Sequence, residues 1–194
     1  MKIGIDFDNT IVNYDALFYK VAEEKGLITK KIPENKFSVK QLIINNGKEE
    51  LWTEIQGYVY GKRMIEAKPY PYFLEFLGEA KKNKIEVKIV SHKTTFPFIG
   101  PKYNLRKSAL EWINNYLKEF DLKNVYFEDT KIDKINRISK LNFNYFIDDL
   151  PEILNSDNFP LNTKKVLFSP DNLVNNENYY VLNSWEDAFD ILNK

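Results

Sequence analysis

Residues 1–12 read MKIGIDFDNTIV, an apolar run that leads into two carboxylates, an amide and a hydroxyl. The run at 2–6 is typical of a buried strand. Asp6 and Asp8 then lie at its carboxyl end, where the ligands of α/β proteins bind. Carboxylates in such a place indicate chemistry, although Asp and Asn are also common turn residues after a strand.

The rest of the chain alternates between strand and helix patterns. Short runs rich in β-branched and aromatic residues recur at 85–91, 124–128, 145–148, 164–169 and 179–182. Apolar residues at three- and four-residue spacings predict helices at 71–84, 104–120, 133–141 and 184–192, with Asn104 and Ser184 as N-caps. Strands alternating with helices predict an α/β fold with a doubly wound, mainly parallel sheet.

One segment interrupts the alternation. Between Thr10 and Pro69 no convincing strand is found, whereas 14–26, 38–47 and 49–64 have helical patterns. We therefore expect a small helical insertion at 13–69, set into an α/β core formed by 1–12 and 70–194.

Composition narrows the class of protein. The 194 residues suffice for one domain with a modest insertion, and 28 basic residues balance 28 acidic ones. Zero net charge gives no general attraction to a nucleic acid polymer or a membrane surface. Cysteine is absent, which excludes disulfides and thiolate zinc sites. With neither a signal-peptide pattern nor an apolar run of about 18 residues, a cytoplasmic protein is expected.

Further polar residues follow other predicted strands. Asp148 and Asp149 end the run YFID, Ser91 closes the run IEVKIVS, and Lys131 and Lys134 open the helix before the second acidic pair. Four carboxylates at one sheet edge would repel each other without a cation. Magnesium accepts carboxylates, water and a substrate phosphate as ligands. The pattern therefore predicts a Mg²⁺ site that holds a phosphoryl group, which one of the acids can attack.

In this order and over residues 2–150, these features resemble the four motifs of the haloacid dehalogenase (HAD) superfamily, most of whose members are phosphatases. The motifs are DFDNT at 6–10, Ser91, a helix-opening lysine, and FIDD at 146–149. Lys131 and Lys134 both compete for the third motif. Lys134 is preferred, since family members usually carry the lysine at the start of the helix.

The resemblance implies a role for each matching residue. Asp6 is the nucleophile that forms an aspartyl-phosphate, and Asp8 is the acid and then the base. Thr10 steadies the loop, while Ser91 and Lys134 bind the phosphoryl oxygens.

The resemblance also implies the metal site and the substrate class. Asp6, the backbone carbonyl of Asp8, and Asp148 hold Mg²⁺, with Asp149 bound directly or through water. The insertion resembles a type I helical cap, loosely that of the deoxyribonucleotidase-like branch. A magnesium-dependent phosphatase is therefore expected, acting on a small phosphorylated metabolite such as a nucleotide or sugar phosphate.

Several alternatives stay open. His92 and Lys93 either contact the phosphate or substrate, or are ordinary polar groups. Lys62, Arg63 and Lys68 are hypothesised to meet an anionic substrate. The same fold also serves non-catalytic or receiver-like modules that bind phosphorylated ligands. A dehalogenase is disfavoured, because members with that chemistry usually lack the second aspartate.

Overall fold

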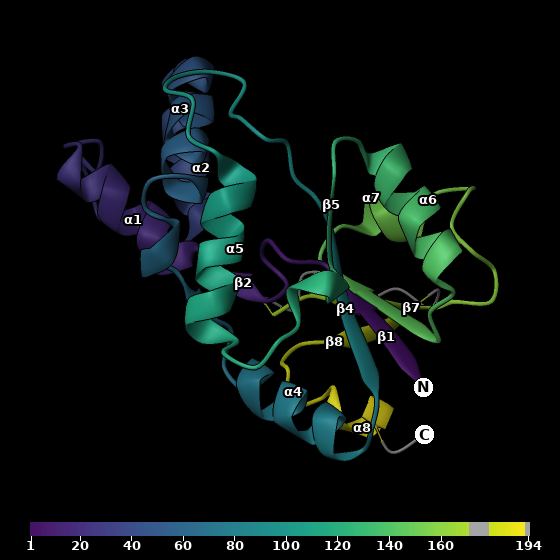
Figure 1. Ribbon diagram of the computed structural model, residues 1–194. Helices are drawn as coiled ribbons and strands as arrows, with labels where there is room; N and C mark the ends of the chain where they lie inside the picture. The colour runs from purple at the N-terminus through teal and green to yellow at the C-terminus, as the bar shows by residue number, and fades with distance from the viewer. Residues whose placement is uncertain (171–178, 193–194) are drawn as a thin grey trace. The chain divides into compact units, whose positions relative to one another are not determined.

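The computed structural model describes residues 1–170 and 179–192 (Figure 1). Its main sheet has six strands in the order β5-β4-β1-β6-β7-β8, and every adjacent pair is parallel. The strands are β1 (Lys2–Ile5), β4 (Glu86–His92), β5 (Val125–Glu128), β6 (Tyr145–Asp148), β7 (Lys164–Phe168) and β8 (Tyr180–Leu182). The predicted doubly wound α/β fold is therefore confirmed, and each predicted strand is found within two residues of its expected bounds.

The register of the central strands brings the predicted site residues to one edge. Ile5 of β1 lies opposite Ile89 of β4 and Ile147 of β6. Three predicted site residues come within two positions after these partners, namely Asp6, Ser91 and Asp148. Because the strands are parallel, all three lie toward the same carboxyl edge of the sheet.

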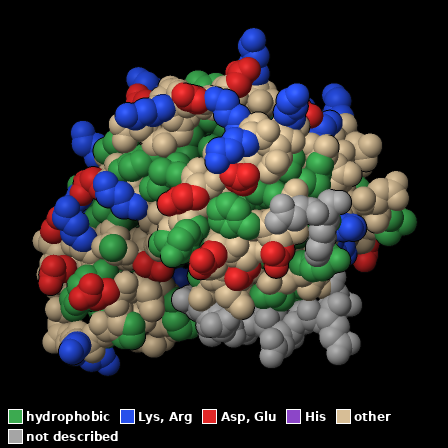
Figure 2. Space-filling view, turned by 90° about the horizontal axis from the view of Figure 1, so that it is seen from below, with side chains coloured by type: hydrophobic (Ala, Val, Ile, Leu, Met, Phe, Trp, Pro, Cys, Tyr) green, Lys and Arg blue, Asp and Glu red, His purple; other side chains and the backbone are tan. Residues whose placement is uncertain are grey.

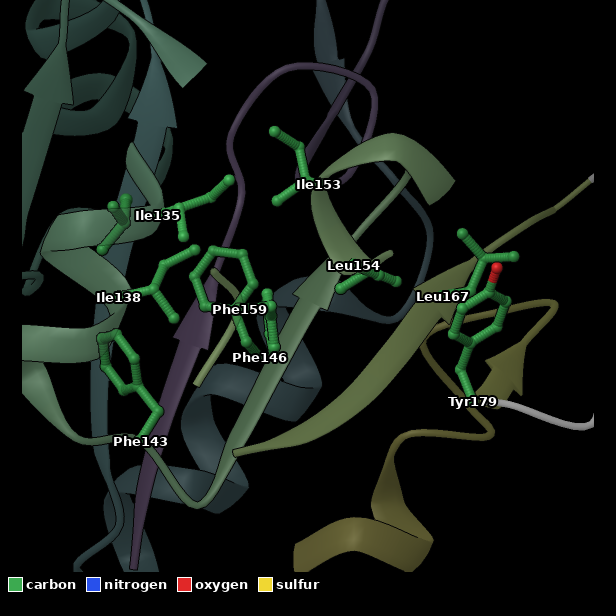
Figure 3. Packing of buried hydrophobic residues seen from close by; sticks show 10 residues of the cluster. Ile135, Ile138, Phe143, Phe146, Ile153, Leu154, Phe159, Leu167 and Tyr179 are labelled. Atoms are coloured by element: carbon green, nitrogen blue, oxygen red, sulfur yellow. The ribbon is translucent and has the colours of Figure 1, made fainter. Parts of the chain in front are cut away.

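Helices cover both faces of this sheet (Figure 1). On one face lie α4 (Phe73–Lys82) and α8 (Phe189–Leu192), and on the other α6 (Lys131–Leu141) and α7 (Pro151–Leu154). Figure 3 shows apolar side chains of α6 and α7 packed against β6 and β7. Gly4 is required beneath this cluster, because a Cβ there would lie 2.5 Å from the ring of Phe146.

A second compact unit consists of residues 13–68 and 94–120. Its helices are α1 (Asp15–Glu24), α2 (Lys36–Asn45), α3 (Glu49–Tyr60), the 3₁₀ turn η1 (Met64–Glu66) and α5 (Leu105–Tyr116). The first unit comprises 1–12, 69–93 and 121–194.

This division differs from the predicted one in residues 94–120, which were expected in the α/β core. They pack with the helical unit for two reasons. The buried Trp112 of α5 donates a hydrogen bond from Nε1 to the carbonyl of Ala67 at 2.9 Å. The preceding loop lies against α3, where Gly57 makes room for the ring of Pro97; a Cβ on Gly57 would lie 2.7 Å from it.

Smaller differences concern short elements. Strands β2 (Val12–Asn13) and β3 (Lys68–Pro69) form a two-stranded sheet where no strand was predicted, because two residues are too few to show a strand period. A second 3₁₀ turn, η2 (Leu122–Asn124), precedes β5. The helix predicted over 184–192 is helical only from Phe189, since the backbone N–H of Ser184 donates to the Asp187 carboxylate in a turn. Asn104 does cap α5, accepting from the Lys107 N–H at 2.9 Å.

The surface carries both signs of charge. On the face shown in Figure 2, basic and acidic side chains are interspersed with apolar ones, in keeping with the balanced composition. A helix that crosses a bilayer needs about 20 apolar residues. Among the described residues no helix is long and apolar enough, and α3 and α5 have only 12 residues each.

Candidate active site

The loop after β1 presents Asp6 and Asp8. The backbone N–H of Asp6 donates to the carbonyl of Ile147 at 2.8 Å, which continues the sheet ladder one residue past β1. The chain then turns tightly, with Asn9 at φ 60°, a left-handed conformation that asparagine tolerates better than most residues. This turn holds both carboxylates at the strand end.

Lys134 joins the two strand ends. Its Nζ lies 2.6 Å from Oδ1 of Asp6 and 2.7 Å from Oδ2 of Asp148, and all three side chains are buried. Lys134 stands in the first turn of α6, which Thr130 caps by accepting from the Asp133 N–H. The structure thus places Lys134 at the carboxylates.

Lys131, the competing candidate, lies elsewhere. Its Nζ is 2.6 Å from Oε1 of Glu152, and both side chains are about half exposed. Of the two lysines left open by the sequence, only Lys134 has a described contact with Asp6 or Asp148.

Burial and charge act against each other in this cluster. Desolvation raises the pKa of Asp148 to about 6, although the charge of Lys134 counteracts part of that effect. Desolvation alone would lower the pKa of Lys134, but the charges of Asp148 and Asp6 outweigh it and the net pKa is raised. The lysine therefore stays protonated at neutral pH, beside two acids that need a cation.

Three carboxylates form a group that suits a metal ion. Asp6, Asp148 and Asp149 each offer an oxygen, and these oxygens lie within 4.8 Å of one another. Oδ1 of Asp148 accepts from the Leu150 N–H at 3.0 Å. Oδ2 of Asp148 is buried without a hydrogen bond of acceptable geometry among the described residues, despite its 2.7 Å contact with Lys134. A buried carboxylate oxygen that lacks a hydrogen bond can serve as a metal ligand. Because the neighbouring ligand atoms are also carboxylate oxygens, the group suits Mg²⁺.

The other predicted site residues, Thr10, Ser91 and His92, differ in burial and in their contacts. Thr10 is fully buried and its Oγ1 donates to Oδ1 of Asp149 at 3.3 Å. Ser91 is buried near the end of β4. His92 is half-buried and its Nε2 lies 3.0 Å from the carbonyl oxygen of Asp129.

Lys93 has a partner that the sequence did not indicate. Its Nζ lies 2.7 Å from Oδ2 and 3.1 Å from Oδ1 of Asp8, with the lysine buried. The sequence offered a surface position or a substrate contact for this residue. Its spacing of two residues from Ser91 is the only signal that could have pointed to the site.

Two of the three cations hypothesised to meet an anionic substrate, Arg63 and Lys68, have partners within the helical unit. Arg63 lies between Glu24, whose Oε2 is 2.7 Å from Nη1, and Glu66, which accepts from Nε. The hydrogen bond from Arg63 is the largest cause that lowers the pKa of Glu66 to about 2. Lys68 donates to the hydroxyl of Tyr116 at 3.0 Å.

No family model and no curated protein matches this chain. Several solved structures have a similar fold. The HAD-family hydrolase from Deinococcus radiodurans, solved with bound phosphate and sodium, is 11% identical with a TM-score of 0.60, and the match covers 99% of this chain and 96% of that one. The HAD hydrolase YfnB from Bacillus subtilis, bound to magnesium, is 13% identical with a TM-score of 0.59, covering 100% and 98%.

A HAD-superfamily hydrolase from Ehrlichia chaffeensis is 17% identical with a TM-score of 0.53, covering 98% of this chain and 95% of that chain. The chain therefore has the fold of HAD-superfamily hydrolases, as its motifs predicted.

Proposed function

We propose that this protein is a magnesium-dependent phosphatase that forms an aspartyl-phosphate on Asp6. The observation that carries the proposal is the buried contact of Lys134 with Asp6 and Asp148, at the sheet edge where β1 and β6 end. Structural cores seldom bury three charges together, because desolvation costs several kcal/mol per ion. Strongly perturbed charged groups at a ligand-binding edge favour a functional site.

The metal would be held by Asp6, Asp148 and Asp149, whose oxygens already converge, together with the backbone carbonyl of Asp8. When bound, Mg²⁺ supplies the positive charge that lets an anionic carboxylate approach an anionic phosphate. Similar folds solved with magnesium, or with phosphate and sodium, support this assignment.

Four residues of the chain have separate roles in the two steps of the proposed reaction. An oxygen of Asp6 attacks the phosphorus, and the bond from phosphorus to the leaving oxygen breaks while Asp8 delivers a proton to that oxygen. Water then attacks the phosphorus of the aspartyl-phosphate and gives its proton to Asp8, while the bond between phosphorus and the Asp6 oxygen breaks and frees the Asp6 carboxylate. Ser91 and Lys134 bind the phosphoryl oxygens during both steps.

The substrate class follows from the same proposal. A small phosphorylated metabolite, such as a nucleotide or sugar phosphate, fits a protein without net charge better than a nucleic acid polymer or a membrane does. We assign the selection of this substrate to the helical unit, residues 13–68 and 94–120, acting as a cap. We also propose that the protein is cytoplasmic.

The test is phosphate release from p-nitrophenyl phosphate, with Mg²⁺ or with EDTA. Wild-type protein should turn over only with Mg²⁺, and Asp6→Asn should be inactive while keeping its circular dichroism spectrum. Lys131→Met, in the half-exposed pair with Glu152, is the matched control and should keep activity. A screen of phosphorylated metabolites follows if the artificial substrate is poor. Folded wild-type protein that hydrolyses none of them, yet binds beryllium fluoride at Asp6, would instead be a phospho-ligand-binding module.

A further inference from the structure

Lys93 reaches the site from a different element than Lys134, which belongs to α6. It directly follows β4, and its backbone N–H donates to the carbonyl of Glu128 at 2.9 Å, so that the ladder between β4 and β5 continues to this residue. Its Nζ lies 5.7 Å from the centre of the Phe7 ring. The backbone is thus fixed by the sheet, and the side chain runs past an aromatic face to Asp8.

The ion pair at its end is buried. The side chain of Lys93 is 2% exposed and that of Asp8 is 18% exposed, with both carboxylate oxygens within 3.1 Å of Nζ. The pair between Lys131 and Glu152 is equally close at 2.6 Å but is about half exposed on both sides. Burying an ion pair costs hydration free energy that the attraction between the two charges often does not repay, and apolar side chains in place of both partners are commonly as stable. Stability alone therefore does not explain why a lysine occupies this position.

The two carboxylates assigned to the reaction are thus held by separate buried lysines. Lys134 of α6 contacts Asp6, and Lys93 after β4 contacts Asp8. We propose that Lys93 is a positioning residue that holds the Asp8 carboxylate in the orientation from which it accepts the proton of the attacking water. This inference rests on the proposed phosphatase function.

The hydrolysis of the intermediate is the step that depends most on this orientation. The water oxygen bonds to phosphorus, its proton passes to Asp8, and the bond between phosphorus and the Asp6 oxygen breaks, returning the electron pair to the Asp6 carboxylate. With p-nitrophenyl phosphate, the first step releases a phenolate that is stable as an anion, so it needs little help from an acid. Misplacing Asp8 should therefore slow the second step selectively.

The experiment is rapid mixing of Lys93→Met with p-nitrophenyl phosphate and Mg²⁺, at enzyme concentrations high enough to see one turnover. We expect a burst of p-nitrophenol close to one equivalent of enzyme, followed by a steady-state rate reduced by roughly 10²-fold, the scale of a lost general base. Acid-quenched samples should contain accumulated phosphorylated protein. Lys93→Arg, which keeps the cation, should recover much of the steady-state rate and shrink the burst.

Lys131→Met is the matched control, with the same substitution in a half-exposed pair, and should behave like wild type. If Lys93→Met does not fold, the burst and the rate are measured on Lys93→Gln and Lys93→Arg. Equal slowing of both phases without accumulated phosphoprotein would overturn the positioning role and leave the proposed function intact. Wild-type protein without any turnover would overturn the proposed function itself.

Discussion

Two clusters in this molecule each place a cation between two acids, and they differ mainly in burial. Lys134 lies between Asp6 and Asp148 with side-chain exposures of 2%, 6% and 0%. Arg63 lies between Glu24 and Glu66, and these side chains are 14%, 45% and 34% exposed. The first cluster is at the end of two central strands, and the second is within the helical unit.

The difference in burial gives the two clusters different physical meanings. Exposed ion pairs contribute about 0–1 kcal/mol each, because water screens the charges and the side chains lose freedom. Buried ions lose several kcal/mol of hydration each, and removing one partner leaves the others uncompensated. We infer that the cluster around Lys134 is present for chemistry, whereas the cluster around Arg63 adds a little stability.

Replacing Lys134 should have the largest effect. Lys134→Met leaves two buried carboxylates without their cation, which should destabilise the protein by about 3–5 kcal/mol in the absence of metal. It should also lower the turnover of p-nitrophenyl phosphate at least about 10²-fold, the scale typical of a lost oxyanion donor. Urea denaturation and steady-state kinetics measure the two effects. Activity near that of wild type would contradict the assigned role.

Magnesium should stabilise the protein through the buried cluster around Lys134 and not through the cluster around Arg63. Saturating Mg²⁺ at about 100 times its dissociation constant should stabilise the wild-type protein by about 2.7 kcal/mol, since only the folded state offers the converging oxygens. Asp148→Asn should lose most of this gain, and Arg63→Met should keep it. Thermal denaturation with Mg²⁺ and with EDTA measures the difference, and an equal gain in both variants would place the ion elsewhere.

Replacing Arg63 should have a much smaller effect on stability than replacing Lys134. Arg63→Met removes the partner of Glu24 and Glu66, both substantially exposed, so we expect a loss of about 1 kcal/mol or less. Lys20, 2.9 Å from Glu66, still pairs with that acid. The unfolding free energy from urea titration at neutral pH measures this. A loss comparable to that of Lys134→Met would break the distinction between the clusters.

The cluster around Arg63 should contribute less to the stability of the folded state as the pH falls. The pKa of Glu66 is lowered from 4.5 to about 2 by its partners, so the folded state holds the ionised form more strongly than the unfolded state does. The stabilisation is present above pH 4.5 and is lost as the pH falls toward 2. The stability difference between wild type and Arg63→Met should therefore shrink over that range. A difference that grows on acidification would contradict the assignment.

Much of the fold and site could be predicted because both depend on short-range patterns. Asp6 and Asp148 each come at or just after the end of an apolar run, and parallel strands bring their carboxyl ends to one edge. Lys134 was preferred over Lys131 because the helix was predicted to begin at residue 133. That ground is wrong, since α6 begins at Lys131, but the contacts agree with the choice of Lys134.

What could not be predicted depends on partners far away in the sequence. Residues 104–120 have the periodicity of an amphipathic helix, which does not say whether its apolar face meets the sheet or other helices. Likewise, nothing near Lys93 in the sequence indicates that it meets Asp8, which is 85 residues away. Only the packed structure identifies such pairs.

The most direct test of the account is the site of phosphorylation during turnover. Wild-type protein and Lys93→Met are mixed with p-nitrophenyl phosphate and Mg²⁺, quenched in acid within the first turnover, reduced with borohydride and mapped by mass spectrometry. We expect the reduction product of an acyl phosphate, homoserine, at position 6, absent with EDTA and absent in Asp6→Asn. Turnover that proceeds without this adduct in either protein, or with the adduct at another residue, would contradict it.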